Sequence, residues 1–218
     1  MQQLLLFVLL GLGSGALIAG LALSVVLTYR GSGIINIATG AMAMLSGYCY
    51  WALKTGEIGG GMSTAPALVL TLVYTLVVGA LIELIAFRPL RNASPLAKLV
   101  SSLGVLLIAQ ASMLLAFGTT QKPQPPILPT RVVHVLGAIV PLDRFLLAGI
   151  VIVIALLLMA LYRWSRFGLA TRAASENEVN AMLAGLSANQ LSMINTLLAS
   201  VVAGSVGVLA ASITQLDS

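Results

Sequence analysis

Long apolar runs separated by short polar segments dominate the chain. A bilayer-spanning helix takes about 20 mostly apolar residues, and six stretches meet or approach this length: residues 4–29, 34–53, 65–87, 99–117, 145–162 and 191–212. Each should be helical, because lipid cannot satisfy free backbone N–H and C=O groups, and the runs are too long and continuous for β-barrel strands. We predict an all-α transmembrane helical bundle of about six spans, forming one domain over residues 1–218.

Composition and charge support this prediction. Hydrophobic residues make up 59% of the chain and charged residues only 8%, whereas about 25% is usual for a soluble domain. This small number of charged residues could not cover the surface of a soluble fold. The apolar surface must therefore face lipid. The net charge of +5 comes from basic residues in short inter-span loops, which is typical of membrane topology, so we expect no nucleic-acid partner.

The basic loops also predict an orientation. Loops after the third and fifth stretches both follow odd-numbered spans, so both can lie on one side, which is cytoplasmic by the positive-inside rule. The residues expected to anchor them there are Arg88, Arg91, Arg166 and Arg172. The N-terminus then lies outside, and the chain is expected in the inner (plasma) membrane as a multi-pass protein.

Two connections have an unusual composition. Residues 30–40 contain Gly31, Gly33 and Gly40, which disfavour a continuous helix, so this segment is expected to be broken or re-entrant. Residues 119–141 contain four prolines between Pro123 and Pro129. We expect that outer connection to be extended or turn-like and not helical.

The chain lacks the groups that membrane enzymes and ion-coupled carriers use. One Cys and one His cannot form a Cys/His metal site, no Walker pattern is present, and no cofactor is expected. Glu83 is the only acid inside a predicted span. It is either a functional carboxylate or a structural one that snorkels or pairs with a basic residue such as Arg88. These absences favour a transport subunit over an enzyme, with energy supplied by another chain.

Polar and small residues inside the spans leave two interpretations open. Four polar side chains either line a solute path or hydrogen-bond between helices: Asn36, Thr39, Gln110 and Asn195. Two stripes of small residues at four-residue spacing either face a partner or a pathway, or pack inside this chain: Gly11, Gly15 and Ala19 in the first span, and Ala199, Ala203, Gly207 and Ala211 in the last.

The connection from 163 to 190 is the longest on the predicted cytoplasmic side. Residues Ala173–Leu186 predict a short helix, and the spacing of Ser175 and Glu178 is that of a capping box, which would start the helix near Ser175. Val179, Met182 and Leu186 share one apolar face, and Gly185 can end the helix or admit a close neighbour. Such a helix suits docking into a groove on a peripheral partner or lying on the membrane surface.

Three segments resemble the permease subunits of ATP-binding-cassette importers for branched-chain amino acids and the related urea-type permeases. They are GSGIINIATGAMAMLSGY (31–48), ELIAFRPLRNASPLAKLVSSLGVLLIAQ (83–110) and RFGLATRAASENEVNAMLAGLSANQ (166–190). The resemblance covers nearly the whole chain, from about Leu10 to Leu209. It implies partnership with ATP-binding subunits that hydrolyse ATP, a second homologous permease subunit and an external solute-binding protein.

The resemblance also implies roles for residues of the cytoplasmic connection. The residues expected to couple the chain to the ATPase are Ser175, Glu178, Val179, Ala181, Met182 and Gly185. Ala181 and Gly185 match the coupling motif of importers, whereas Val179 stands where that motif has Glu. The family usually has His-Gly where this chain has Thr39-Gly40, and its members continue for about two more spans. We therefore expect a fragment or a short form that lacks the C-terminal spans.

Two other function classes stay open. A urea or amide importer permease would keep the architecture and change the solute. A membrane scaffold would use the loop around Val179 to dock a partner without transport of its own.

Overall fold

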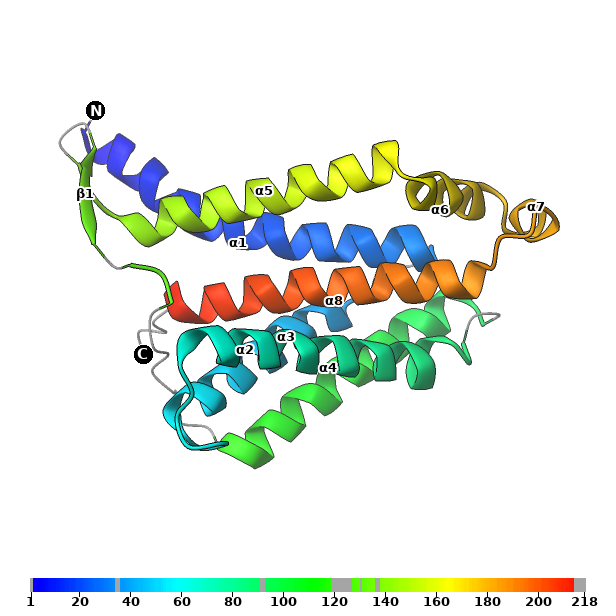
Figure 1. Cartoon of the computed structure of the whole chain (residues 1–218), viewed down its shortest axis with the longest axis horizontal. Helices are drawn as coiled ribbons and strands as arrows, with labels where there is room; N and C mark the ends of the chain where they lie inside the picture. The colour runs from blue at the N-terminus through cyan, green and yellow to red at the C-terminus, as the bar shows by residue number, and fades with distance from the viewer. Residues whose placement is uncertain are drawn as a thin grey trace.

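Nearly all the described elements of the computed structural model are helices (Figure 1). It describes residues 2–33, 36–90, 93–118, 127–129, 131–135 and 138–213. The elements are, in chain order, α1 (Gln2–Ser32), α2 (Ala38–Thr55), α3 (Thr64–Ile82), η1 (Glu83–Phe87), α4 (Pro95–Phe117), β1 (Val132–Val135), β2 (Ala138–Pro141), α5 (Leu142–Trp164), α6 (Arg166–Glu176), α7 (Glu178–Leu183) and α8 (Ala188–Ile213). This confirms the predicted all-α membrane bundle.

Five helices of the described chain, not six, are long and apolar enough to cross a membrane. They correspond to the predicted stretches 4–29, 65–87, 99–117, 145–162 and 191–212. The remaining stretch, 34–53, is helical only as α2, which does not meet this criterion. Twelve residues of α2 are buried, because α2 packs against α3, α4 and α8. The buried residues include the polar Thr39, Ser46 and Tyr50, which face protein rather than lipid and contribute to the lower hydropathy of α2.

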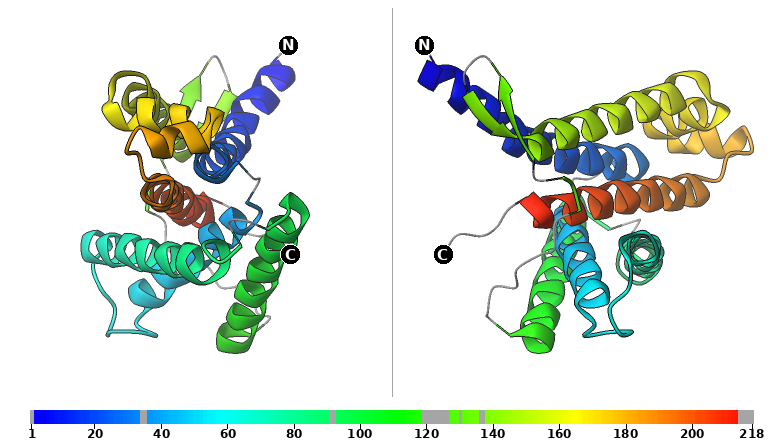
Figure 2. Two further views of the ribbon diagram at one scale, coloured as in Figure 1. Left: turned by 90° about the vertical axis from the view of Figure 1, so that its right-hand side faces the viewer. Right: turned by 60° about the vertical axis from the view of Figure 1, so that its left-hand side comes forward.

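The central helix of the bundle is α8. It runs between α1 and α5 on one side and α2 and α3 on the other (Figures 1 and 2). In its most apolar window 56% of residues are buried, against 22% or less in the other four spans. Ala199, Ala203 and Gly207 are all buried, so this predicted stripe packs inside the chain. At Gly207 an added Cβ would lie 2.1 Å from the Ala43 carbonyl oxygen, so only glycine allows this approach of α2.

The small-residue stripe predicted in the first span is not the packing face of α1. Gly11, Gly15 and Ala19 are exposed, and no described atom outside the helix's own backbone lies within 4 Å of a Cβ built on Gly11 or Gly15. The buried small residues are Gly13, Ala16 and Gly20. The packing face of α1 therefore has the same small-residue character as the predicted stripe but lies at a different angle around the helix.

A second pair of stripes joins α3 to α8. Every fourth residue of α3 and η1 is buried: Ala67, Thr71, Thr75, Gly79 and Glu83. Residues four apart form one inclined row on a helix surface, and this row faces the α8 row Ser192, Thr196, Ser200 and Gly204. A Cβ added at Gly79 would meet the Ser200 hydroxyl, and one added at Gly204 would meet Thr75. The two helices therefore pack closely through small and hydroxyl side chains.

A β-hairpin lies within the connection predicted to be non-helical. Strands β1 and β2 pair antiparallel, with Val132 opposite Pro141 and Val133 opposite Val140. The described residues of 119–141 contain no helix, as the prolines predict. Strand β2 contacts α1 and ends at Pro141, the residue before α5.

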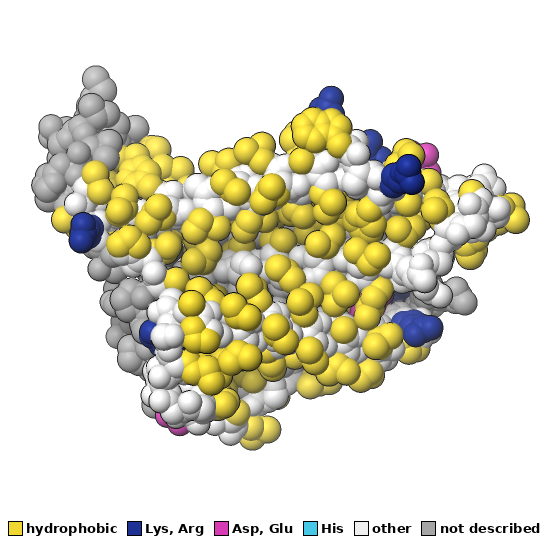
Figure 3. Space-filling model, in the orientation of Figure 1, with side chains coloured by type: hydrophobic (Ala, Val, Ile, Leu, Met, Phe, Trp, Pro, Cys, Tyr) yellow, Lys and Arg dark blue, Asp and Glu magenta, His cyan; other side chains and the backbone are white. Residues whose placement is uncertain are grey.

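The two ends of the bundle differ in what they carry. The η1–α4 turn, α6 and α7 lie at one end, and the hairpin and the α2–α3 turn lie at the other (Figure 1). Apolar side chains cover the flank between the ends, whereas Lys and Arg side chains lie toward the ends (Figure 3). This distribution suits a bundle whose flank faces lipid and whose ends face water.

Candidate functional site

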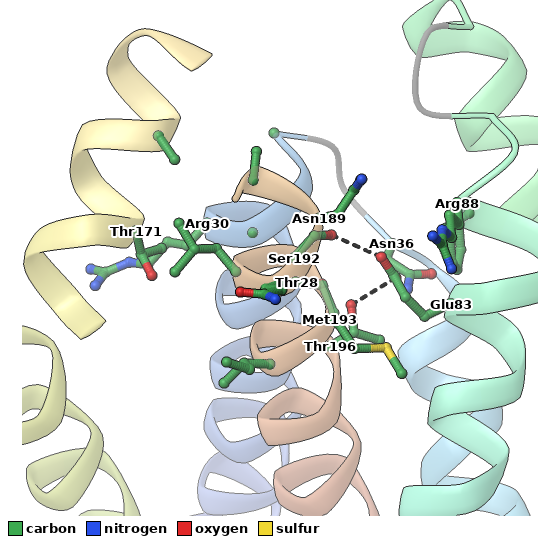
Figure 4. A pocket seen from close by; sticks show the side chains of 18 of the residues that line it. Thr28, Arg30, Asn36, Glu83, Arg88, Thr171, Asn189, Ser192, Met193 and Thr196 are labelled. Carbon is green, nitrogen blue, oxygen red and sulfur yellow. Dashed lines mark hydrogen bonds between the residues drawn. The ribbon is translucent and has the colours of Figure 1, made fainter. Parts of the chain in front are cut away.

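The candidate site is a cavity of about 570 Å³ at the end of the bundle that carries α6 and α7. It lies around the first turns of α8 and is bordered by the end of α1, the residues before α2, η1, the start of α4 and α6 (Figure 4). Its polar and charged lining residues are Thr28, Arg30, Asn36, Glu83, Arg88, Lys98, Thr171, Ser175, Asn189, Gln190, Ser192 and Thr196. Its volume falls in the range of small-molecule sites.

Glu83 is the buried acid of this cavity, with 8% of its surface exposed. It continues the buried row of α3 and opens the π-helical segment η1, in which the Arg88 N–H bonds the Glu83 carbonyl at 2.7 Å. The Ser192 and Thr196 hydroxyls each donate to one carboxylate oxygen at 2.8 Å. Of the alternatives left open for Glu83, snorkelling is therefore excluded, because two hydroxyls of α8 hold the carboxylate inside the bundle.

A second polar contact holds α8 from the opposite side. The Tyr162 hydroxyl on α5 donates to the side-chain oxygen of Asn195, and the Asn195 amide donates to the Leu191 carbonyl at 2.7 Å. Arg30 lies over the Tyr162 ring at 4.9 Å, and Arg172 donates to the Tyr162 carbonyl at 3.2 Å. Tyr162 therefore joins α5 to α8 and also contacts Arg30 on α1 and Arg172 on α6.

The predicted break after the first span is present. α1 ends at Ser32, Gly33 has φ +69, and α2 begins at Ala38. The Asn36 side chain accepts from the Ala38 N–H at 2.9 Å and Thr39 donates to the Asn36 carbonyl at 2.8 Å. Both side chains are buried, so they satisfy the backbone at the start of α2, and Asn36 also lines the cavity.

The four polar residues predicted inside the spans therefore lie in different environments. Asn36 lines the cavity, Thr39 bonds locally, and Asn195 bridges α5 and α8. Gln110 is exposed on α4 and lies outside the cavity. Sequence reasoning did not single out Ser192 or Tyr162. The four-residue spacing of Ser192, Thr196 and Ser200 in an apolar helix is a signal that could have found the α8 row.

The connection predicted to be cytoplasmic forms two short helices instead of one. Ser165 caps α6 by accepting from the Gly168 N–H. Asn177 is extended and caps α7 by accepting from the Asn180 N–H at 3.0 Å. The predicted cap at Ser175 is wrong, because Ser175 lies in the last turn of α6 and donates back to the Arg172 carbonyl. Asn is as good a helix cap as Ser, and Asn177 lies at the turn between α6 and α7.

Gly185 terminates α7 just after its last residue, Leu183, which is one of the two roles predicted for this glycine. It has φ +83, its N–H bonds the Met182 carbonyl, and the Leu186 N–H bonds the Ala181 carbonyl, each at 3.0 Å. These two bonds form a Schellman motif. Among the described residues, apart from its chain neighbours, no heavy atom lies within 4 Å of an added Cβ, so the requirement for glycine here is conformational.

The remaining predicted coupling residues lie on α7 or next to it. Ala181 is buried, whereas Val179 and Met182 are exposed, as is the neighbouring Leu183 with 82% of its surface. Glu178 is the first residue of α7. Short helix α7 therefore presents a row of apolar side chains outside the bundle.

Three of the four predicted topology anchors lie in the described residues, and all three are at the end with α6 and α7. Arg88 follows η1, Arg166 begins α6 and Arg172 lies within it. Arg91 lies outside the described residues. Within the described part of the chain, no group of three or more His, Cys, Asp or Glu residues could hold a metal ion.

Comparison with protein families gives a match over nearly the whole chain. Residues 7–218 match the model of the branched-chain amino acid transport system permease component. The chain belongs to this family. The resemblance seen in the sequence is thereby confirmed, and with five candidate spans this member of the permease family is a multi-pass inner-membrane protein.

Relatives of known name support the assignment. The chain is 26% identical over 190 residues to the high-affinity branched-chain amino acid transport system permease protein BraD of Pseudomonas aeruginosa, which covers 83% of this chain and 62% of BraD. It is 26% identical over 210 residues to the high-affinity branched-chain amino acid transport system permease protein LivH of Escherichia coli K12, a match that covers 91% of this chain and 68% of LivH. The chain thus spans about two thirds of the length of these relatives. No solved structure matches it significantly.

Proposed function

We propose that this chain is the permease subunit of an ATP-driven importer that carries branched-chain or other small amino acids across the inner membrane. The family match over residues 7–218 carries the proposal. The names of BraD and LivH, both high-affinity branched-chain amino acid permease proteins, support this class of solute.

The exposed side chains of helix α7 support the proposal of a partner protein at the predicted cytoplasmic end. Val179, Met182 and Leu183 are all more than half exposed, on a helix of only six residues. An exposed apolar face on a short helix suits a groove on a partner protein. We assign this groove to an ATP-binding subunit, which would hydrolyse ATP in a separate chain, and we include a second permease and an external solute-binding protein in the assembly.

The connection between α7 and α8 supports a coupling role. α7 ends at Leu183 and α8 begins at Ala188, with the turn at Gly185 between them, so displacement of α7 would act on the first turn of α8 through this short connection. That turn leads to Ser192, Asn195 and Thr196, whose hydrogen bonds tie α8 to η1 and α5. ATP binding by the partner would thus favour one of two arrangements of α8, as an alternating-access cycle requires.

The test is ATPase activity of the full assembly in liposomes, with and without binding protein loaded with leucine. We expect the loaded protein, and not the empty protein, to stimulate hydrolysis. Stimulation by urea or an amide but by no amino acid would replace the solute, and failure to co-purify with any ATPase would favour the scaffold alternative.

A pair of variants tests the docking face itself. Leu183→Glu on α7 should prevent co-purification of the ATP-binding subunit, because it places a charge in the apolar contact. Leu96→Glu is the matched control, since Leu96 lies at the same end of the bundle and is 71% exposed. Equal co-purification of both variants would remove α7 from the interface.

A further inference from the structure

We propose that the cavity beside Glu83 binds an amino acid as a zwitterion, with the ammonium group at Glu83 and the carboxylate at the basic side chains near it. The inference rests on the proposed importer function and adds to it the place and the chemistry of solute binding. It is carried by the position of Glu83, by the cations of the same cavity and by its apolar wall.

Within the described part of the chain, Glu83 has acceptor capacity beyond its two hydroxyl partners. A carboxylate has about four lone-pair positions, and hydroxyls of Ser192 and Thr196 occupy one on each oxygen. A buried acid in a membrane span is costly and is kept where it serves a solute or ion path. The two hydroxyls fix the carboxylate on the wall of the cavity, so it can receive a cation without reorganising.

Groups for the opposite charge lie in the same cavity. Arg88 and Lys98 both line it, and Arg88 follows η1, the segment that Glu83 begins (Figure 4). Arg30 lies on the other side of α8 over the Tyr162 ring, so it is already engaged. Arg88 provides a planar donor pair suited to a carboxylate, one turn of η1 away from the acid.

The rest of the wall suits an apolar side chain. Leu84, Phe87, Met193 and Ile194 line the cavity together with the charged groups. One acid, nearby bases and an apolar wall complement the three parts of a branched-chain amino acid. Urea has no charge and no apolar part, so this lining favours amino acids over urea among the solutes that the sequence left open.

The test measures direct binding to the ATP-free assembly of the full-length chain in nanodiscs, without binding protein. Tritiated leucine is displaced by unlabelled leucine, 3-methylbutan-1-amine, 4-methylpentanoate or urea. The amine lacks the carboxylate and the acid lacks the ammonium group. We expect each to compete about 10- to 100-fold more weakly than leucine, the usual effect of losing a charge-assisted hydrogen bond, and urea not to compete.

Two variants test which residue binds the ammonium group of the ligand and which binds its carboxylate. Glu83→Gln should weaken leucine binding by about 10- to 100-fold and leave 4-methylpentanoate binding unchanged, because that ligand has no ammonium group. Arg88→Gln should weaken leucine and 4-methylpentanoate but not the amine, and since Arg88 is exposed this variant does not threaten folding. Glu57→Gln, an exposed acid before α3, is the control and should bind leucine as the native chain does.

The outcomes separate the two proposals. If the native assembly imports leucine but neither variant changes the ranking of ligands, or if Glu83→Gln weakens all ligands equally, the cavity is not the amino-acid site and the importer function stands. If the native assembly imports no amino acid, both proposals are wrong.

Discussion

The Tyr162 hydroxyl on α5 donates a hydrogen bond to the side-chain oxygen of Asn195 on α8, inside the bundle. Asn195 is fully buried. On the neighbouring positions of α8, Ser192 and Thr196 bond Glu83. The start of the central helix is therefore held by polar contacts to two different helices, next to the proposed coupling segment.

Tyr162→Phe should destabilise the protein by about 1–3 kcal/mol, because it leaves the buried Asn195 oxygen without its donor. The measurement is thermal unfolding of the purified protein in detergent. Tyr29→Phe is the control, since Tyr29 is 52% exposed and its hydroxyl should be replaceable at little cost. Equal midpoints for the two variants would contradict the structural role of the Tyr162 hydroxyl.

Ser192→Ala should also lower stability, by about 1.5–3 kcal/mol, because Glu83 would lose one of the two hydroxyls that hold its carboxylate. Ser205→Ala gives the comparison on the same helix, since the Ser205 hydroxyl bonds the Val201 carbonyl of its own helix. Thermal unfolding of both variants should show a larger loss of stability for Ser192→Ala than for Ser205→Ala. A larger loss for Ser205→Ala would show that Glu83 is held in some other way.

Gly207→Ala should separate α2 from α8, since the new Cβ would lie 2.1 Å from the Ala43 carbonyl oxygen. Overpacking of this kind costs about 1–3 kcal/mol. Gly104→Ala on α4 is the control, because no neighbouring element in the described chain lies within 4 Å of its Cβ position. The yield of monodisperse protein on size exclusion after heating measures both, and an unaffected Gly207→Ala protein would mean that the two helices do not approach as described.

Gly185→Ala should uncouple the assembly with little loss of bundle stability. The left-handed conformation at φ +83 costs an alanine about 1–2 kcal/mol, so the end of α7 would loosen and ATPase stimulation by loaded binding protein should fall. Gly149→Ala, with open space around its Cβ position, should leave stimulation unchanged. Normal stimulation in the Gly185→Ala assembly would show that the geometry of this turn does not matter for coupling.

The sequence predicted the features that depend on local pattern. Long apolar runs located five spans, glycines located the break after Ser32, and Gly185 located the end of α7. These succeed because span length and helix termination are set by residues close together in the chain.

Features that depend on distant partners were missed or misassigned. The partners of Glu83 lie 109 and 113 residues away, so the sequence suggested the nearby Arg88 instead. Neighbouring helices also decide that α2 is buried in the bundle. They likewise decide which side of α1 becomes its packing face. The rows Thr71–Thr75–Gly79–Glu83 and Ser192–Thr196–Ser200 were visible in the sequence, but only their pairing gives them meaning.

The most direct test of the central claim is uptake of radiolabelled leucine into proteoliposomes that contain the full-length chain with its ATP-binding, permease and solute-binding partners. Uptake should require ATP on the side of α7 and solute-binding protein on the other side, and it should be lost with Leu183→Glu. Leucine uptake that proceeds without ATP, or an intact assembly that transports no amino acid, would contradict the account.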